Sequence, residues 1–319
     1  MVIVAVAGGT GGVGKTVVEQ LCLSRTKHQV FILGRKIPVE KLPEPHEFLA
    51  VNYNDVDGLA RILEDHGIDT LISTLNLENE AGSQAQLNLI AAADKSRTTR
   101  RIIPSEFLSV VDENDPHTGP GMGGWIPNAL ALKKSNLEYI RISIGFFADY
   151  WGMPHIQSLL RPFTWGIDIA NAKAVIPGTG DEKFTVTYSI DLARVIVRLL
   201  DEKDKWPERG FLSGSDISFN EILAIAENIR GVKFDVVYDP LEKLAKGQST
   251  LLWRPEEVPE KEMKALMSAH GQLIVSGACQ VPSEGRLDSS YPDIRLMTAE
   301  ELLTQAWTGK WDQKIEVTP

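Results

Sequence analysis

The stretch 1–21, MVIVAVAGGTGGVGKTVVEQL, decides the fold of this 319-residue chain. Its first seven residues form a continuous apolar run, which is typical of a central parallel strand buried on both faces. Glycines follow at positions 8, 11 and 14, and apolar residues then return at helical spacing. This order of strand, glycine turn and helix indicates a dinucleotide site, because glycines let the backbone approach a pyrophosphate and the helix N-terminus faces it.

The alternation of strand and helix patterns continues to about residue 144. It predicts an α/β fold, a Rossmann doubly wound parallel sheet with a smaller C-terminal α/β substrate lobe. We expect an NADP-binding domain over residues 1–150 and a substrate lobe over 151–319, with about 185–215 returning to the Rossmann sheet. Residues 109–128, rich in glycine and proline, are expected to form a long loop near the ligand crevice.

Composition and charge limit the classes of molecule that this protein is expected to bind. The formal net charge is −10, so nucleic acid and anionic membranes are poor partners. No run approaches the ~20 apolar residues that span a bilayer. Two cysteines and six scattered histidines suggest neither a disulfide framework nor a metal site. We expect a cytoplasmic protein, a monomer or homodimer, that binds a small-molecule substrate.

The end of the second predicted strand bears on the choice of cofactor. Gly34-Arg35-Lys36 places two cations where an NAD-binding protein carries a carboxylate, and this favours the 2′-phosphate of NADPH. A solvated basic loop is the alternative. The residues expected to contact the cofactor lie on the glycine turn, after strand two and after strand four: Gly8, Thr10, Gly11, Gly12, Val13, Gly14, Arg35, Lys36, Thr74, Leu75 and Asn76.

The same turn also matches the phosphate-binding motif of nucleotide triphosphatases. Residues 9–16, GTGGVGKT, fit GxxxxGK[ST] literally. Such a protein needs a magnesium-binding aspartate at the end of an apolar strand. The candidate strand has Asp69 at its start and Asn76 at its end, so the dinucleotide interpretation is preferred.

Several longer segments resemble the NmrA-like, isoflavone-reductase-like branch of atypical short-chain dehydrogenases, in a fungal style. They include residues 5–21, 32–36 (ILGRK), 102–107 (IIPSEF), 134–150 (KSNLEYIRISIGFFADY) and 176–200. Residues 217–238 and 291–303 extend the resemblance over nearly the whole chain. It implies a Rossmann domain, NADPH, and reduction of small unsaturated, carbonyl or imine compounds of secondary metabolism. Some members of the family bind dinucleotides as sensors without known turnover.

The resemblance also implies a catalytic lysine on the helix before the sixth predicted strand, residues 137–144. That lysine should fall near Trp125-Ile126-Pro127, where this chain has none. The nearest lysines are Lys133 and Lys134, and Lys134 becomes the candidate if the preceding loop shifts the register. Loss of the lysine would suit an iminium substrate, since a cation beside a cation is unfavourable.

The remaining candidates follow the fifth and sixth strands. Glu106 and Tyr150 could donate or relay a proton, although Glu106 could instead be a structural carboxylate. The predicted substrate wall consists of Phe107, Trp125, Phe146, Phe147, Trp151 and His155. These residues favour an NADPH-dependent reductase of an imine, enone or carbonyl compound. The alternatives are a non-catalytic dinucleotide sensor and a cofactor-independent isomerase or cyclase.

Overall fold

The computed structural model describes residues 1–37, 46–112 and 124–310. Its main sheet has six parallel strands in the order β3-β2-β1-β4-β5-β6, which is the order of a doubly wound Rossmann sheet and confirms the predicted fold class. The strands are β1 (Ile3–Ala7), β2 (Gln29–Gly34), β3 (Glu47–Ala50), β4 (Thr70–Ser73), β5 (Arg101–Ile103) and β6 (Glu138–Tyr139).

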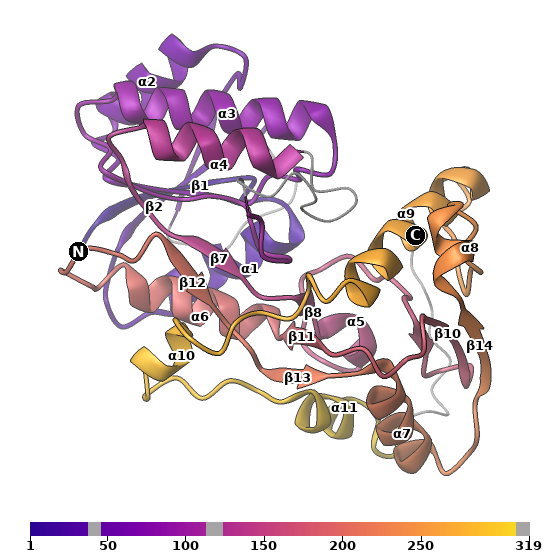
Figure 1. Cartoon of the computed structure of the whole chain (residues 1–319). Coiled ribbons are helices and arrows are strands. Elements are labelled where there is room, and N and C mark those ends of the chain that lie inside the picture. The colour runs from indigo at the N-terminus through magenta and orange to yellow at the C-terminus, as the bar shows by residue number, and fades with distance from the viewer. Residues whose placement is uncertain (38–45, 113–123, 311–319) are drawn as a thin grey trace.

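Helices cover both faces of this sheet (Figure 1). On one face lie α1 (Gly12–Leu23) and α6 (Ser189–Leu199), and on the other α2 (Val56–Asp65), α3 (Glu80–Lys95) and α4 (Trp125–Lys134). Alternate residues of β1 pack into two apolar cores, one on each face of the sheet. Val4 and Val6 pack with α1 and α6, whereas Ala5 and Ala7 pack toward α2 and α3. The continuous apolar run at the N-terminus is thus explained by burial on both sides.

The sixth strand predicted over residues 137–144 is divided between two sheets. Its first part, β6, pairs with β5, and its second part, β7 (Arg141–Ser143), pairs with β12 (Arg209–Phe211). α6 packs against α1 in the same region. Part of the chain beyond residue 185 therefore packs with the Rossmann elements.

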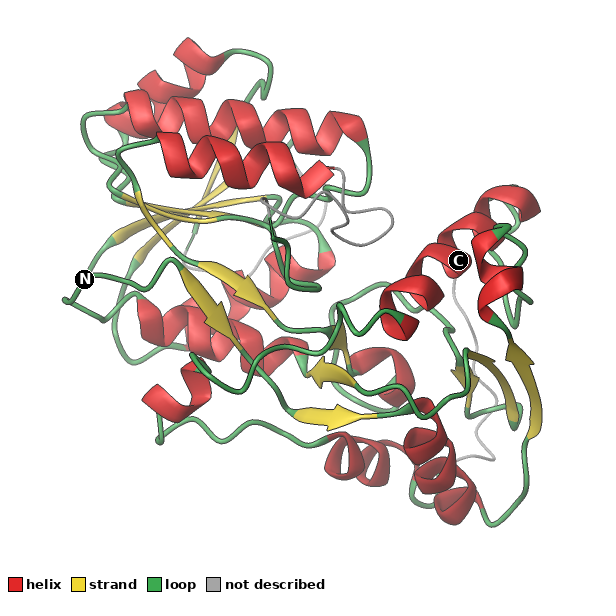
Figure 2. Cartoon of the chain, viewed as in Figure 1, coloured by secondary structure: helices red, strands yellow, loops and turns green. Residues whose placement is uncertain are grey.

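The smaller lobe contains two further sheets (Figure 2). One is β13-β11-β8, formed by Ser215–Ile217, Phe184–Thr187 and Phe146–Phe147, and the other is β14-β10-β9, formed by Asp235–Asp239, Lys173–Pro177 and Ile167–Asp168. The helices of this part are α5 (Asp149–Gly152), α7 (Phe219–Arg230), α8 (Leu241–Ala245), α9 (Glu260–Val275), α10 (Leu287–Ser290) and α11 (Ala299–Trp307).

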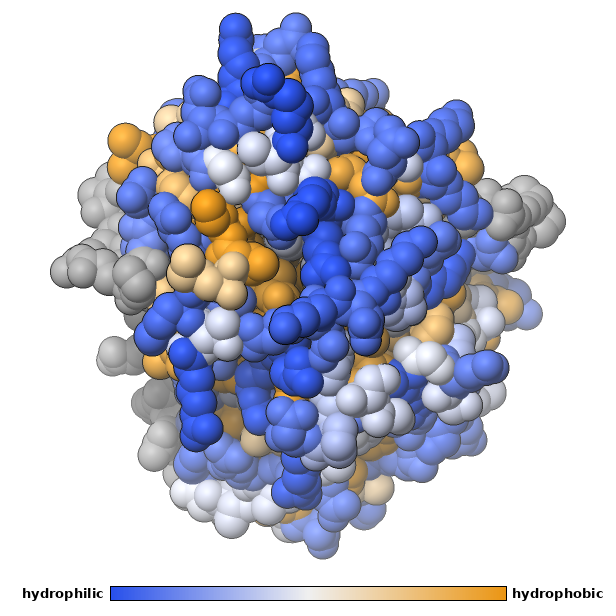
Figure 3. All heavy atoms as spheres, turned by 90° about the vertical axis from the view of Figure 1, so that its left-hand side faces the viewer, coloured by the Kyte–Doolittle hydropathy of each residue, from blue (hydrophilic) through white to orange (hydrophobic). Residues whose placement is uncertain are grey.

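One apolar cluster joins the smaller lobe to the Rossmann domain. It contains Leu77 and Trp125 from the Rossmann side and Phe146, Trp165 and Phe219 from the lobe. The face of the molecule that bears the N-terminus is, by contrast, predominantly hydrophilic (Figure 3). Among the described residues, no helix combines the length and hydropathy needed to cross a membrane.

Candidate cofactor and substrate site

The glycine turn lies where β1, β4 and α1 approach most closely. Gly8 has a φ of +78°, and a Cβ there would stand 2.9 Å from the hydroxyl oxygen of Thr74. A Cβ on Gly14 would lie 2.3 Å from the carbonyl oxygen of Gly8. At Gly11 the nearest atom to such a Cβ is 3.4 Å away. Gly8 and Gly14 are therefore required by packing of the turn itself, whereas Gly11 has more room.

The N-terminus of α1 has the features of an anion site. Its N-cap is Gly11, with no side-chain cap, and its first turn carries no acidic residue. No side chain of the first turn of α1 therefore neutralises the partial positive charge of the helix, and these residues fit a pyrophosphate. Thr16 is 1% exposed and its hydroxyl donates to the carbonyl of Gly12 at 3.0 Å. This inward orientation does not suit the magnesium-binding role that a triphosphatase would give Thr16.

The strand ends beside the turn carry the other predicted cofactor residues. Arg35 and Lys36 are exposed directly after β2. In the described part of the chain, Arg35 forms no hydrogen bond or ion pair, and its exposed guanidinium has the charge and geometry to bind a phosphate. After β4, the Thr74 hydroxyl donates to the Ala7 carbonyl at 2.8 Å, and the Asn76 side chain accepts from the Glu78 amide at 2.8 Å.

Helix α4 starts earlier than expected. Residues 125–128 were predicted to belong to a loop, but α4 begins at Trp125, with Pro127 in its first turn, where a proline is tolerated. Residues 113–123 of the predicted loop lie outside the described residues. The lysines of α4 are confined to its last turn, and Lys134 is exposed there, about 13.5 Å along the helix from Trp125. This position is on the amino-terminal side of β6, away from the glycine turn.

Glu106 lies in a buried ion pair. Its Oε2 accepts a hydrogen bond from Nε of Arg141 at 2.7 Å, and the two side chains are 2% and 5% exposed. Arg141 also donates to the carbonyl of Val111 at 2.9 Å. These contacts tie the segment after β5 to β7, so they favour the structural alternative for Glu106 over proton transfer.

We therefore expect Glu106→Gln to lower stability, because it leaves the Arg141 cation buried without its counter-charge. Breaking a buried pair costs about 3–5 kcal/mol. Chemical denaturation should show this loss, and a Glu106→Leu, Arg141→Met double variant should recover part of it. A Glu106→Gln protein with unchanged stability and abolished turnover would instead restore the proton-transfer role.

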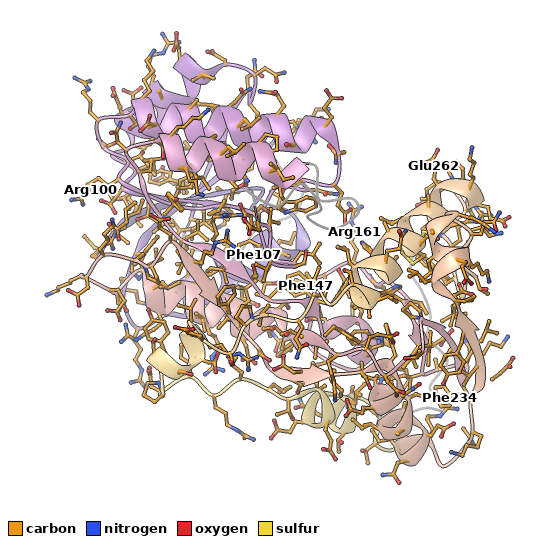
Figure 4. All side chains as sticks on the ribbon, in the orientation of Figure 1. Arg100, Phe107, Phe147, Arg161, Phe234 and Glu262 are labelled. Atoms are coloured by element: carbon orange, nitrogen blue, oxygen red, sulfur yellow. The ribbon has the colours of Figure 1, made fainter. Side chains whose placement is uncertain are left out.

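The predicted substrate wall is divided among different surroundings. Phe146 and Trp125 lie buried in the apolar cluster that joins the two lobes. Phe107 and Phe147, both labelled in Figure 4, pack with the core between the sheet and α1 and α6. Adjacent residues of β8 thus face opposite sides, so Phe147 does not share the surroundings of Phe146.

Trp151 and His155 are both held by contacts within the smaller lobe. The Trp151 indole donates to the carbonyl of Trp165 at 3.0 Å, and Trp151 belongs to the same apolar cluster as Phe146 and Trp125. The His155 ring contacts Trp307 of α11 edge to face, with centroids 4.8 Å apart. The geometry places these two residues in packing contacts with the lobe and α11.

Tyr150 remains at the boundary between the lobes. Its ring contacts Phe163, with centroids 5.6 Å apart. Burial, together with the negative charges of Asp149 and Glu78, raises the pKa of Tyr150 to about 12. The phenol therefore keeps its proton at neutral pH and could act as a hydrogen-bond donor.

Sequence reasoning missed Glu78 and His270, which face each other across the two lobes. Nε2 of His270, on α9, lies 3.8 Å from Oε1 of Glu78, in the loop after β4. The His270 ring also contacts Phe146 and Trp165 edge to face, at centroid distances of 5.7 and 5.8 Å. Met263 and Met267 at helical spacing and acidic residues at 260 and 262 could have indicated α9; the pairing with Glu78 depends on tertiary structure.

Comparison with known proteins extends these observations. The model of the NmrA-like family matches residues 2–271. The chain belongs to the NmrA-like family. Among the described residues there is no group of histidine, cysteine and acidic side chains able to hold a metal ion. The family assignment is consistent with the dinucleotide-binding Rossmann fold that the glycine turn indicates.

Members of the family similar to this chain include fungal oxidoreductases. Oxidoreductase swnN of Metarhizium robertsii is 29% identical, covering 97% of this chain and 98% of that protein. Oxidoreductase BOA1 of Botryotinia fuckeliana is 34% identical, covering 73% and 78%.

Solved structures share the fold. AtPrR2 with NADP⁺ and (+)-pinoresinol has a TM-score of 0.71 at 18% identity, covering 95% of this chain and 97% of that one. A ternary complex of leucoanthocyanidin reductase from Vitis vinifera has a TM-score of 0.72 at 18% identity, covering 95% and 98%. These likenesses show that the fold, a Rossmann sheet with a smaller lobe, is shared over almost the whole chain.

Proposed function

We propose that this member of the NmrA-like family is an NADPH-dependent reductase of a small secondary metabolite with an imine, enone or carbonyl group. The observation that carries the proposal is the N-terminus of α1 at a tight glycine turn, without a side-chain cap, with the exposed Arg35 beside it and unpaired among the described residues. The curated relatives swnN and BOA1 are named oxidoreductases, and AtPrR2 was solved with NADP⁺, which supports the same cofactor here.

Each part of the site would serve a separate purpose. The backbone of Gly11, Gly12 and Val13 would hold the pyrophosphate, and Arg35 and Lys36 the 2′-phosphate. Bound NADPH would supply a hydride, and the protein would supply orientation and electrostatics. Phe146 and Trp125, in the cluster between the lobes, would bind the apolar part of the substrate.

The position of the lysines favours a departure from the family's usual chemistry. The first two turns of α4 contain no lysine, and Lys134 lies at the opposite end. The same observation keeps a second candidate function open, that of a dinucleotide sensor without turnover. A sensor would bind NADPH and NADP⁺ similarly and would reduce none of the substrate classes.

The proposal is tested by following NADPH oxidation with a panel of cyclic imines, N-alkyl iminium salts, enones and ketones. We expect turnover with at least one class, and NADPH to be preferred over NADH. Product formation in the absence of NADPH would instead indicate an isomerase or cyclase. Tight NADPH binding without oxidation of any panel member would favour the sensor.

A further inference from the structure

His270 lies at the contact between the smaller lobe and the Rossmann domain. It comes from α9 of the smaller lobe, and its Nε2 faces Glu78 of the Rossmann domain across 3.8 Å. Glu78 follows β4 and the predicted cofactor residues Thr74–Asn76 by a few positions. The imidazole therefore lies between the carboxyl edge of the sheet and the aromatic cluster.

The two ring nitrogens have different surroundings. Nε2 faces the Glu78 carboxylate, and the nearby imidazole holds the pKa of Glu78 below its usual value. Nδ1 is buried and has no hydrogen-bond partner. The rings of Phe146 and Trp165 lie edge to face with the imidazole. A buried polar atom without a partner is unfavourable and uncommon, so it indicates a group that a ligand can satisfy.

We propose that His270, oriented by Glu78, donates a proton through Nδ1 to the heteroatom of a carbonyl or neutral imine substrate. This inference rests on the proposed reductase function and defines its proton donor. His270 would be the catalytic residue, because it touches the substrate, and Glu78 a positioning residue. A carboxylate that orients one nitrogen of an imidazole while the other transfers a proton is an established arrangement in catalysis.

The reaction balances with this single donor. When hydride adds to the carbon of a C=O or neutral C=N bond, the π electron pair moves to oxygen or nitrogen. That atom takes the proton from protonated His270, leaving a neutral imidazole that solvent reprotonates. An N-alkyl iminium needs no proton, since its nitrogen becomes a neutral amine when hydride adds. The proposal therefore predicts dependence on His270 for ketones and not for N-alkyl iminium ions.

The first test measures binding and needs no turnover. Calorimetry with NADP⁺ present compares 2-tetralone with tetralin, which has the same skeleton without the oxygen. We expect the wild type to bind the ketone roughly two- to tenfold more tightly, as for one hydrogen bond. His270→Leu should abolish this preference, and His66→Gln, a half-buried histidine contacting Phe31 in the Rossmann domain, should retain it. Equal affinity of the wild type for both ligands would overturn the proposal.

The second test separates hydrogen bonding from proton transfer. Turnover of 2-tetralone is compared with that of N-methyl-3,4-dihydroisoquinolinium. His270→Gln, which keeps an N–H donor, should retain affinity for the ketone while kcat falls roughly 10²- to 10⁴-fold, and turnover of the iminium should change little. If Tyr150→Phe abolished ketone reduction and His270→Gln did not, the phenol would be the donor. An enzyme inactive on both compounds would count against the reductase function, while the binding test would still decide whether Nδ1 of His270 donates a hydrogen bond to the ketone.

Discussion

Arg35→Ala is expected to weaken NADPH binding roughly ten- to a hundredfold while NADH binding changes little. The side chain follows β2, is exposed, and has no ion-pair partner among the residues that the structure describes. A hydrogen bond to a charged group contributes about 1.5–3 kcal/mol, which corresponds to this range. Only NADPH carries the 2′-phosphate, so the loss should be selective. Calorimetric titration with both cofactors measures it.

A charge-matched control is available near the opposite end of α1. Arg25 is exposed two residues after the helix ends, and Arg25→Ala removes the same charge without touching the predicted phosphate site. We expect its affinities for both cofactors to remain near those of the wild type. Equal losses for NADPH and NADH in Arg35→Ala would refute the assignment to the 2′-phosphate and would favour the solvated-loop alternative.

Gly14→Ala is expected to disrupt the turn and to weaken NADPH binding roughly ten- to a hundredfold. The new Cβ would stand 2.3 Å from the Gly8 carbonyl oxygen and 2.7 Å from the Thr74 hydroxyl oxygen, so backbone must move. Overpacking of this kind costs about 1–3 kcal/mol. Thermal denaturation should show a lower Tm, and calorimetry a weaker NADPH complex.

Gly11→Ala is the variant to compare with Gly14→Ala. Its Cβ would have one neighbour at 3.4 Å, and its φ of −86° is accessible to alanine. We expect a Tm close to that of the wild type but weaker NADPH binding, because the methyl group would stand at the helix N-terminus. Unchanged affinity in both glycine variants would mean that the pyrophosphate binds elsewhere.

The Rossmann half of the chain could be predicted because its signals are local. β1 is apolar throughout since both of its faces are buried, and the glycine turn follows it directly. The capping box of α11, formed by Thr298 and Glu301, is likewise a local signal. The order of strand, glycine turn and helix at the start of the chain, which depends on neighbouring residues alone, was therefore confirmed.

The site was less predictable because its residues come from distant segments. His270 and Glu78 are 192 positions apart, and α9 was not predicted at all. The Glu106–Arg141 pair and the division of the sixth strand depend on contacts formed only in the folded chain. Phe146 and Phe147 are adjacent and of the same residue type. The pleat of β8 directs their side chains to opposite faces, and therefore into different apolar clusters.

The central claim is that the chain reduces a small molecule with hydride from NADPH. The most direct measurement is mass spectrometry of the product formed with NADPH deuterated at C4. The account predicts that one deuterium appears at the reduced carbon of a panel substrate, from one face of the nicotinamide ring only. A product that forms without deuterium, or at the same rate without cofactor, would contradict it.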